Sequence, residues 1–185
     1  PLFLRFSGLD YDSDDAAGEK LDAYIGWVQG VLAHHGGYLI QVTVGDKGSY
    51  LYAVFGAPLA HDDDPIRAVA AALELQSPPP ALSFVTSTQI GISQGRMRVG
   101  AYGSPRRRTY GVLGDETNVA SRLMTRAQPG QTLISKRIAD AVGARYRLTD
   151  LGSVELKGKQ EPIPVFSLLR GRASTASHLA DRPIT

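Results

Sequence analysis

The sequence contains no cysteine among its 185 residues, so it can form neither a disulfide nor a thiolate metal site. Aromatic residues make up only 8% of it, and the formal net charge of +2 does not by itself indicate a nucleic-acid partner. No apolar run approaches the roughly 20 residues that a membrane-spanning helix needs. These absences favour a domain of a reducing, cytoplasmic compartment that binds no nucleic acid and spans no membrane.

What the sequence does contain is a regular succession of strand and helix patterns. Apolar residues recur at helical spacing from Ala17 to about His34 and again after Asp64-Pro65, and short apolar runs between turn residues predict strands. The predicted order is β-α-β-β-α-β, followed by further elements. We therefore expect an α/β fold, described more closely as an α+β sandwich. It has a ferredoxin-like core, an antiparallel sheet with helices on one face, and C-terminal additions.

The ends of the chain suggest how the domain is bounded. The sequence starts inside a strand pattern at Pro1-Leu-Phe-Leu4 and has no initiator methionine, so we expect a domain excised from a longer protein. Residues 1–170 are predicted to form this domain. Residues 171–185 are polar and show no periodicity, which is typical of a linker or tail.

The segment from Tyr110 to Met124 is the most informative one for function. It predicts a short strand, a tight turn at Gly114-Asp115 and then a helix. Asn118 and Arg122 are four residues apart and therefore share one face of that helix near its start. An amide and a guanidinium in this arrangement suit an anion with directional oxygens, such as a phosphate. The simpler alternative is a surface pair without a function.

Four segments, taken in order, resemble the catalytic domain of the class III adenylyl and guanylyl cyclases. They are residues 37–56, 90–103, 110–124 and 156–159. The turn Gly45-Asp-Lys-Gly48 and the apolar strand pattern after it, which ends in Phe55-Gly56, are most similar to the second cyclase half of soluble adenylyl cyclases. The resemblance implies a class III nucleotidyl cyclase fold and the conversion of ATP or GTP to a 3′,5′-cyclic nucleotide and pyrophosphate.

The same resemblance implies roles for three residues. In this family the active site lies between two domains: one holds two Mg²⁺ (or Mn²⁺) ions through two aspartates, and the other supplies Asn, Arg and Lys. By resemblance, Asn118 orients the ribose, Arg122 stabilises charge on the α-phosphate, and Lys157 binds the terminal phosphates, with Lys159 as an alternative donor. Cationic donors at these places agree with the need of phosphoryl transfer for positioning and charge neutralisation.

The metal-binding positions depart from the family pattern. Arg5 stands where the family has its first metal aspartate, and a cation there repels magnesium. Asp46 lies near the position of the second aspartate, in an expanded turn that leaves its register open. One carboxylate is a poor site for two magnesium ions, so no metal site is predicted on this chain. A shifted register that places Arg5 at a strand edge is the alternative.

The positions that would read the nucleotide base depart from the pattern as well. They hold Gln41 or Val42, depending on the register, and Gly111. The choice between ATP and GTP therefore stays open.

The sequence thus predicts a domain that contributes the Asn/Arg/Lys half of a shared site. A second cyclase domain, in tandem or in a homodimer, would hold the metal ions. Alone, the domain is expected to have little or no activity. The alternative is a catalytically inactive pseudo-cyclase that acts as a dimerisation or regulatory module.

Three further patterns have simpler interpretations. Asp10, Asp12 and Asp14 have the spacing of a calcium loop, but the glycine and glutamate that such a loop needs are absent, so we expect helix-capping carboxylates. Residues 106–108 are all arginine and predict a solvated loop, with pyrophosphate or an acidic partner as alternative ligands. The segment from Lys47 to Phe55 resembles a strand motif of RNA-recognition domains, with an insertion and two mismatches.

Overall fold

The computed structural model describes residues 1–45, 48–143, 145–156 and 161–172. Over these residues seven strands form one sheet in the order β2-β3-β1-β4-β7-β9-β8, and β5 and β6 form a separate two-stranded sheet. The strands of the main sheet are β1 (Leu2–Ser7), β2 (Tyr38–Thr43), β3 (Ser49–Val54), β4 (Ser87–Ile92), β7 (Thr132–Ser135), β8 (Tyr146–Val154) and β9 (Ile163–Arg172). The remaining elements are β5 (Arg98–Ser104), β6 (Arg107–Leu113), α1 (Ala17–His34), α2 (Asp64–Leu75), α3 (Asp115–Arg126), α4 (Lys136–Val142) and the 3₁₀ turn Pro80–Leu82.

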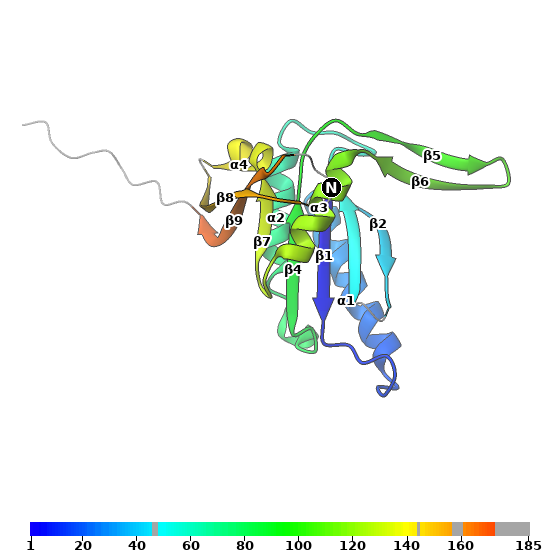
Figure 1. Ribbon diagram of the computed structural model, residues 1–185. Helices are drawn as coiled ribbons and strands as arrows, with labels where there is room; N and C mark the ends of the chain where they lie inside the picture. Colours follow the sequence, from blue (N-terminus) through cyan, green and yellow to red (C-terminus); the bar gives the residue numbers. More distant parts are fainter. Residues whose placement is uncertain (46–47, 144, 157–160, 173–185) are drawn as a thin grey trace, which may run out of the picture.

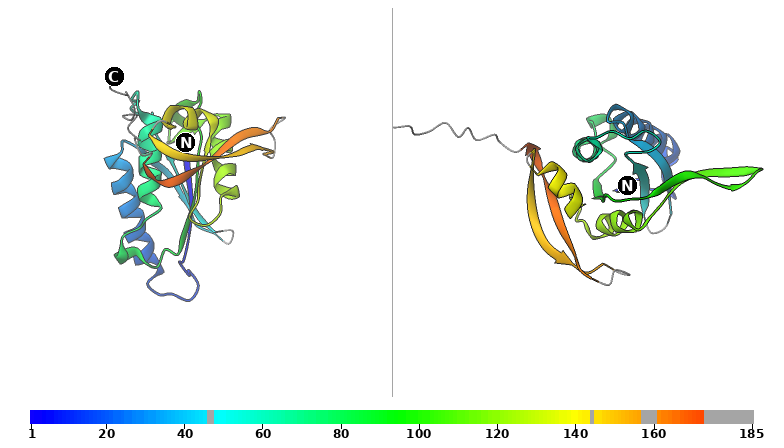
Figure 2. Two further views of the ribbon diagram at one scale, coloured as in Figure 1. Left: turned by 90° about the vertical axis from the view of Figure 1, so that its left-hand side faces the viewer. Right: turned by 90° about the horizontal axis from the view of Figure 1, so that it is seen from above.

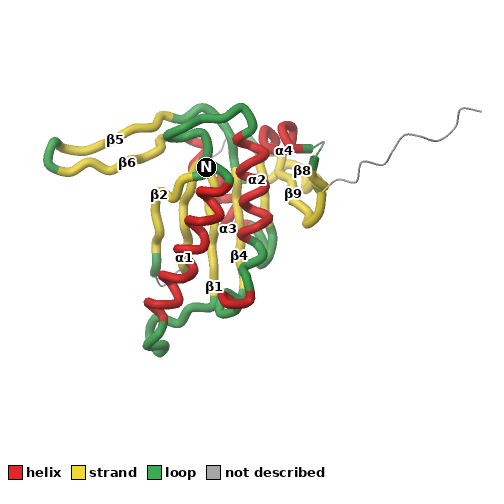
Figure 3. The backbone as a smooth tube through the Cα atoms, turned by 180° about the vertical axis from the view of Figure 1, so that it is seen from behind, coloured by secondary structure: helices red, strands yellow, loops and turns green. Residues whose placement is uncertain are grey.

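The α/β class is confirmed, while the sheet and the helix layers differ from the expectation in two ways. The pairing of β4 with β7 is parallel, so the sheet is mixed rather than antiparallel throughout. The helices cover both faces of the sheet, with α1 and α2 on one side and α3 on the other (Figure 1, Figure 3). The view from above shows the sheet between these two layers (Figure 2).

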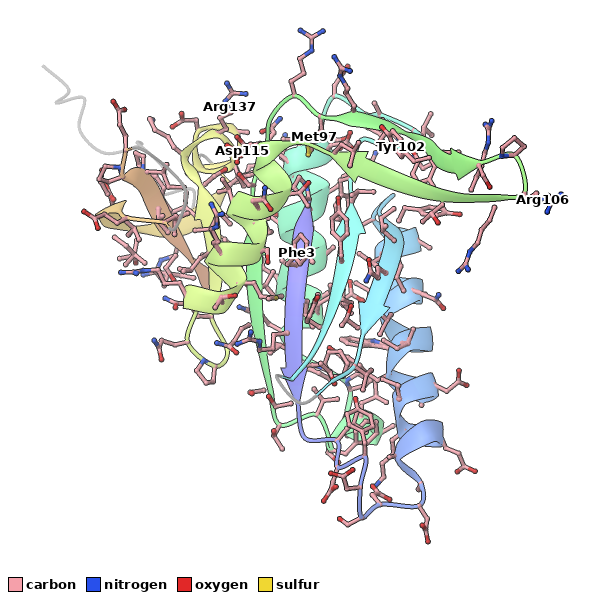
Figure 4. All side chains as sticks on the ribbon, turned by 45° about the vertical axis from the view of Figure 1, so that its right-hand side comes forward. Phe3, Met97, Tyr102, Arg106, Asp115 and Arg137 are labelled. Carbon is pink, nitrogen blue, oxygen red and sulfur yellow. The ribbon has the colours of Figure 1, made fainter. Side chains whose placement is uncertain are left out.

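Each face of the sheet carries a hydrophobic core, and the side chains of β1 alternate between these two cores. Leu2, Leu4 and Phe6 are buried under α1 and α2. Phe3 points to the opposite face, where its ring stacks on that of Tyr52 with 4.5 Å between the ring centroids. Figure 4 shows Phe3 beside α3. Helix α3 therefore rests on the sheet face that carries Phe3, and the next odd-numbered residue of β1, Arg5, belongs to the same face.

The hairpin of β5 and β6 projects away from the body of the domain (Figure 1). Its strands include residues 107 and 108, which we had expected in a loop, so the turn at its tip is shorter than predicted. Figure 4 shows Arg106 at this tip. Strand β9 continues to Arg172.

Candidate active site

Helix α3 lies unusually close to the sheet because Gly91 of β4 has no side chain. A Cβ atom at Gly91 would be 2.1 Å from the carbonyl oxygen of Ala120. The first turn of α3 is also fixed, since the hydroxyl of Ser93 donates a hydrogen bond to the carboxylate of Glu116. Acidic residues in the first turn, Asp115 and Glu116, interact favourably with the helix dipole. Together these contacts hold the backbone of α3 close against the sheet.

Asn118 and Arg122 lie on the side of α3 away from its buried residues Val119, Ala120 and Leu123. The side chain of Asn118 is exposed, and within the described part of the chain it has no hydrogen bond or ion pair. Arg122 is partly exposed, yet its Nη1 atom is buried and has no hydrogen-bond partner among the described residues. A buried guanidinium nitrogen without an acceptor is costly, so this arrangement favours an anionic ligand.

Arg5 lies in the middle of the sheet rather than at an edge. Strand β1 is flanked by β3 and β4, and the Cα partners of Arg5 are Tyr50 and Gln89. The alternative of an edge residue is therefore wrong. Arg5 is partly exposed, and its Nε atom is buried without a hydrogen-bond partner in the described residues.

The positions expected near the base differ in their surroundings. Val42 packs against the core under α1 and α2, whereas Gln41 is exposed and pairs with Tyr52, whose side chain lies on the α3 face. Only Gln41 therefore shares a face with Arg5. Gly111 belongs to β6. A Cβ atom at Gly111 would lie 3.5 Å from the ring of Tyr102.

The profile of the adenylate and guanylate cyclase catalytic domain matches residues 17–169. The chain belongs to this family. Its members are lyases that form cyclic nucleotides, and their fold is the one observed here.

Among the relatives of this cyclase domain is adenylate cyclase type 10 of Rattus norvegicus, which is 25% identical over 170 residues. That match covers 91% of this chain but only 10% of the relative. The adenylyl cyclase CyaB from P. aeruginosa has a similar structure, with a TM-score of 0.83 and 22% identity over 92% of this chain and 93% of that one. The guanylyl cyclase Cya2 has a TM-score of 0.78 and 27% identity over 95% and 92% of the two chains.

Magnesium, which cyclases of this class use, does not fit the described residues of this cyclase domain. They contain no group of three or more Asp, Glu, His or Cys side chains that could hold a metal ion. The sequence prediction that Arg5 stands in place of the first metal aspartate stays a prediction. Asp46, Lys157 and Lys159 lie outside the described residues, so their predicted roles stay predictions.

The other sequence patterns have structural roles in this cyclase domain. Asp10 accepts hydrogen bonds from the backbone N–H groups of Asp12 and Ser13, and Asp14 accepts one from Ala16 and another from Lys20. These bonds lower the pKa of both carboxyls, with the side chains of Ser13 and Lys20 as the largest causes. The ring of Tyr52 is buried in a stack, so it is not part of an open platform for RNA bases.

A cavity of about 230 Å³ lies apart from Asn118 and Arg122, between the ends of β3 and β4 and the start of α2. Neither residue lines it, so this cavity is not the candidate site. Among the described residues no helix is long and apolar enough to cross a membrane.

Proposed function

We propose that this domain supplies the Asn/Arg/Lys half of a nucleotidyl cyclase site whose metal-binding half belongs to a second cyclase domain. The observation that carries the proposal is the pair on α3: an exposed amide and a guanidinium, one helical turn apart, that lack partners among the described residues. The presence of Arg5 at the place of a metal aspartate explains why the metal should come from elsewhere. The resemblance to the second half of soluble adenylyl cyclases points in the same direction.

In this proposal each residue acts on a different part of a nucleoside triphosphate, ATP or GTP. The amide of Asn118 orients the ribose so that its 3′-oxygen lies in line with the α-phosphorus. The guanidinium of Arg122 neutralises the charge that grows on the α-phosphate oxygens as pyrophosphate leaves. Lys157 binds the terminal phosphates. Magnesium or manganese, held by the aspartates of the partner domain, supplies the remaining positive charge.

The hairpin of β5 and β6 supports assembly with a second domain. It projects from the body (Figure 1), and Val99, Tyr102 and Leu113 on it are 46%, 40% and 54% exposed. Its residues 98–113 include four arginines and no acidic residue. Large apolar side chains on an exposed, projecting hairpin are typical of a protein–protein contact. We infer a partner cyclase domain, reached in tandem or by dimerisation, in the cytoplasm.

The test is a reconstitution with a cyclase domain that has both metal aspartates but carries Ala in place of its own Asn and Arg. The mixture with the wild-type chain should form cyclic nucleotide from Mg-ATP or Mg-GTP, and the chain alone should form little or none. Arg122→Ala should lower the rate by about 10²-fold or more, because the charge on the α-phosphate is then not neutralised. The matched control is Arg126→Ala, an exposed arginine on the last turn of α3. Full turnover by the chain alone, or equal rates for the two variants, would contradict the proposal.

A second candidate function, a catalytically inactive pseudo-cyclase, is favoured by the same Arg5. A domain of this kind would change the activity of its partner by contact alone. The discriminating measurement uses a partner that is already active as a dimer. If the chain alters its rate and neither Asn118→Ala nor Arg122→Ala changes that effect, the regulatory role is the correct one.

A further inference from the structure

Helix α3 packs against β1 and β4 and leaves β2 and β3 uncovered on its face of the sheet (Figure 1). A row of polar side chains runs across this face from β2 to β4. The register of the antiparallel strands places Thr43 opposite Tyr50, Tyr50 opposite Arg5, and Arg5 opposite Gln89. Directly opposed residues in antiparallel strands project from the same face. These four side chains, the Arg5 row, therefore lie side by side on four adjacent strands.

Arg5 is the charged member of the row, and nothing acidic balances it in the described residues. No ion pair or hydrogen bond of its guanidinium occurs there, and its Nε atom is buried without a partner. An uncompensated cation on a strand in the middle of a sheet lowers stability unless an anion meets it. An anion bound at the row would therefore compensate the charge of Arg5.

Two neighbours of Arg5 carry hydroxyl groups that can donate hydrogen bonds, while the amide Nε2 of Gln89 donates to the carbonyl oxygen of Ala127. Thr43 accepts a hydrogen bond from the Nε2 atom of Gln41 at 3.1 Å, which leaves its own hydroxyl hydrogen free to donate. The hydroxyl of Tyr50 has no hydrogen bond within the described ranges. Because adjacent strands are about 4.8 Å apart, one ligand with several oxygens can reach Arg5 and Tyr50 together.

The turn between β2 and β3 comes close to Arg5. Gly48 in this turn has a φ angle of 99°, and a Cβ atom there would be 4.0 Å from the Nε atom of Arg5. Because residue 48 is glycine, it places no side chain beside the guanidinium.

We propose that Arg5, Tyr50 and Thr43 form a metal-independent binding site for a small phosphate anion such as pyrophosphate. In this chain a guanidinium thus takes the place at which a metal aspartate stands in the family, and it binds the anion directly through charge-assisted hydrogen bonds. The site does not depend on the half-site role of α3, since it needs neither Asn118 nor Arg122 nor a partner domain.

The experiment titrates the full chain with pyrophosphate in EDTA at physiological ionic strength, by calorimetry or by phosphorus-31 NMR line broadening. The wild type should bind at millimolar pyrophosphate or below. Arg5→Gln should weaken binding by about tenfold or more, because the charged guanidinium group and its hydrogen bonds to the anion are lost. Tyr50→Phe should weaken it by a factor of about three, as expected for one neutral hydrogen bond. Should Arg5→Gln fail to fold, Arg5→Lys provides the same test, since it keeps the charge but loses the bidentate geometry.

One matched variant makes the result specific. Arg147→Gln removes the same charge from an exposed position on β8 of the same sheet. It should bind pyrophosphate as the wild type does. The proposal is overturned if the wild type shows no binding, if Arg5→Gln binds equally well, or if Arg147→Gln is impaired to the same degree. None of these results depends on cyclase activity, so the half-site proposal is tested separately.

Discussion

The backbone of α3 at Ala120 rests directly on Gly91 of β4. A Cβ atom at Gly91 would be 2.1 Å from the carbonyl oxygen of Ala120 and 2.3 Å from the backbone nitrogen of Met124. No real side chain tolerates such distances, so only glycine allows the helix to come this close. The distance of the candidate residues Asn118 and Arg122 from the sheet is therefore set by Gly91, which is far from them in the sequence.

We predict that Gly91→Ala lowers the free energy of unfolding by about 1–3 kcal/mol, because the helix must move away from the sheet to make room for the methyl group. It should also lower the rate in the reconstituted assay, since Asn118 and Arg122 move with the helix. Urea unfolding and the cyclic-nucleotide assay provide the two measurements. The control is Gly26→Ala in α1, where a Cβ atom would meet nothing within 4 Å and should stabilise the helix. Unchanged stability in Gly91→Ala would show that α3 does not sit as described.

Replacing Tyr24 by Phe should make the free energy of unfolding less sensitive to alkaline pH. Tyr24 is fully buried beside Phe6, and its hydroxyl has no hydrogen-bond partner among the described residues. Burial raises its pKa well above the ordinary value of 10.0. The unfolded chain therefore loses this proton first, and the free energy of unfolding falls as the pH rises above about 10.

The prediction is that Tyr24→Phe reduces this fall between pH 8 and pH 11 and gains about 1 kcal/mol at pH 7, because an unpaired buried hydroxyl is removed. Urea unfolding at several pH values measures both effects. Tyr38→Phe, at a side chain that is 56% exposed, is the control and should follow the wild type. An equally steep alkaline decline in Tyr24→Phe would rule out this explanation.

The exposed hairpin should matter for association and not for folding. We predict that Leu113→Glu weakens binding to the metal-bearing partner domain by about tenfold or more, since it places a charge in an apolar contact. Sedimentation or surface-binding measurements give the affinity, and a thermal melt should be unchanged. Leu59→Glu, at a side chain that is 67% exposed and outside the hairpin, is the matched control. Equal affinity for both variants would mean that Leu113 lies outside the interface.

Local patterns were enough to predict much of the fold. The apolar spacing of Tyr24, Val28, Val31 and Leu32 predicted α1, and all four are buried. The hairpin of β2 and β3 followed from two short apolar runs and a glycine turn. The start of α3 at the Gly114-Asp115 turn is confirmed as well. These features depend on residues that are close together in the chain, so a single sequence contains the information.

Features that depend on distant pairs could not be predicted. The parallel pairing of Ile90 with Thr132 joins strands about 40 residues apart. No local pattern in either segment indicates which strand it pairs with. The arginines at 107 and 108 belong to β6 although their charge is typical of a loop. The neighbours of Arg5, Tyr50 and Gln89, became visible only through the register of the sheet. The sequence predicts a departure from the family pattern at Arg5, but it does not show which side chains surround Arg5.

The place of Arg5 in β1 restricts which assemblies can be enzymes. A twofold-symmetric pair of these chains would contain two identical shared sites. If those sites are built as in the family, each would set Arg5 of one copy against Asn118 and Arg122 of the other, cation facing cation. Positive charge would then accumulate at both sites, and neither Arg5 nor Arg122 attracts a divalent ion. An unlike partner breaks this symmetry, so one site can become a reaction centre while the other stays a pocket for anions.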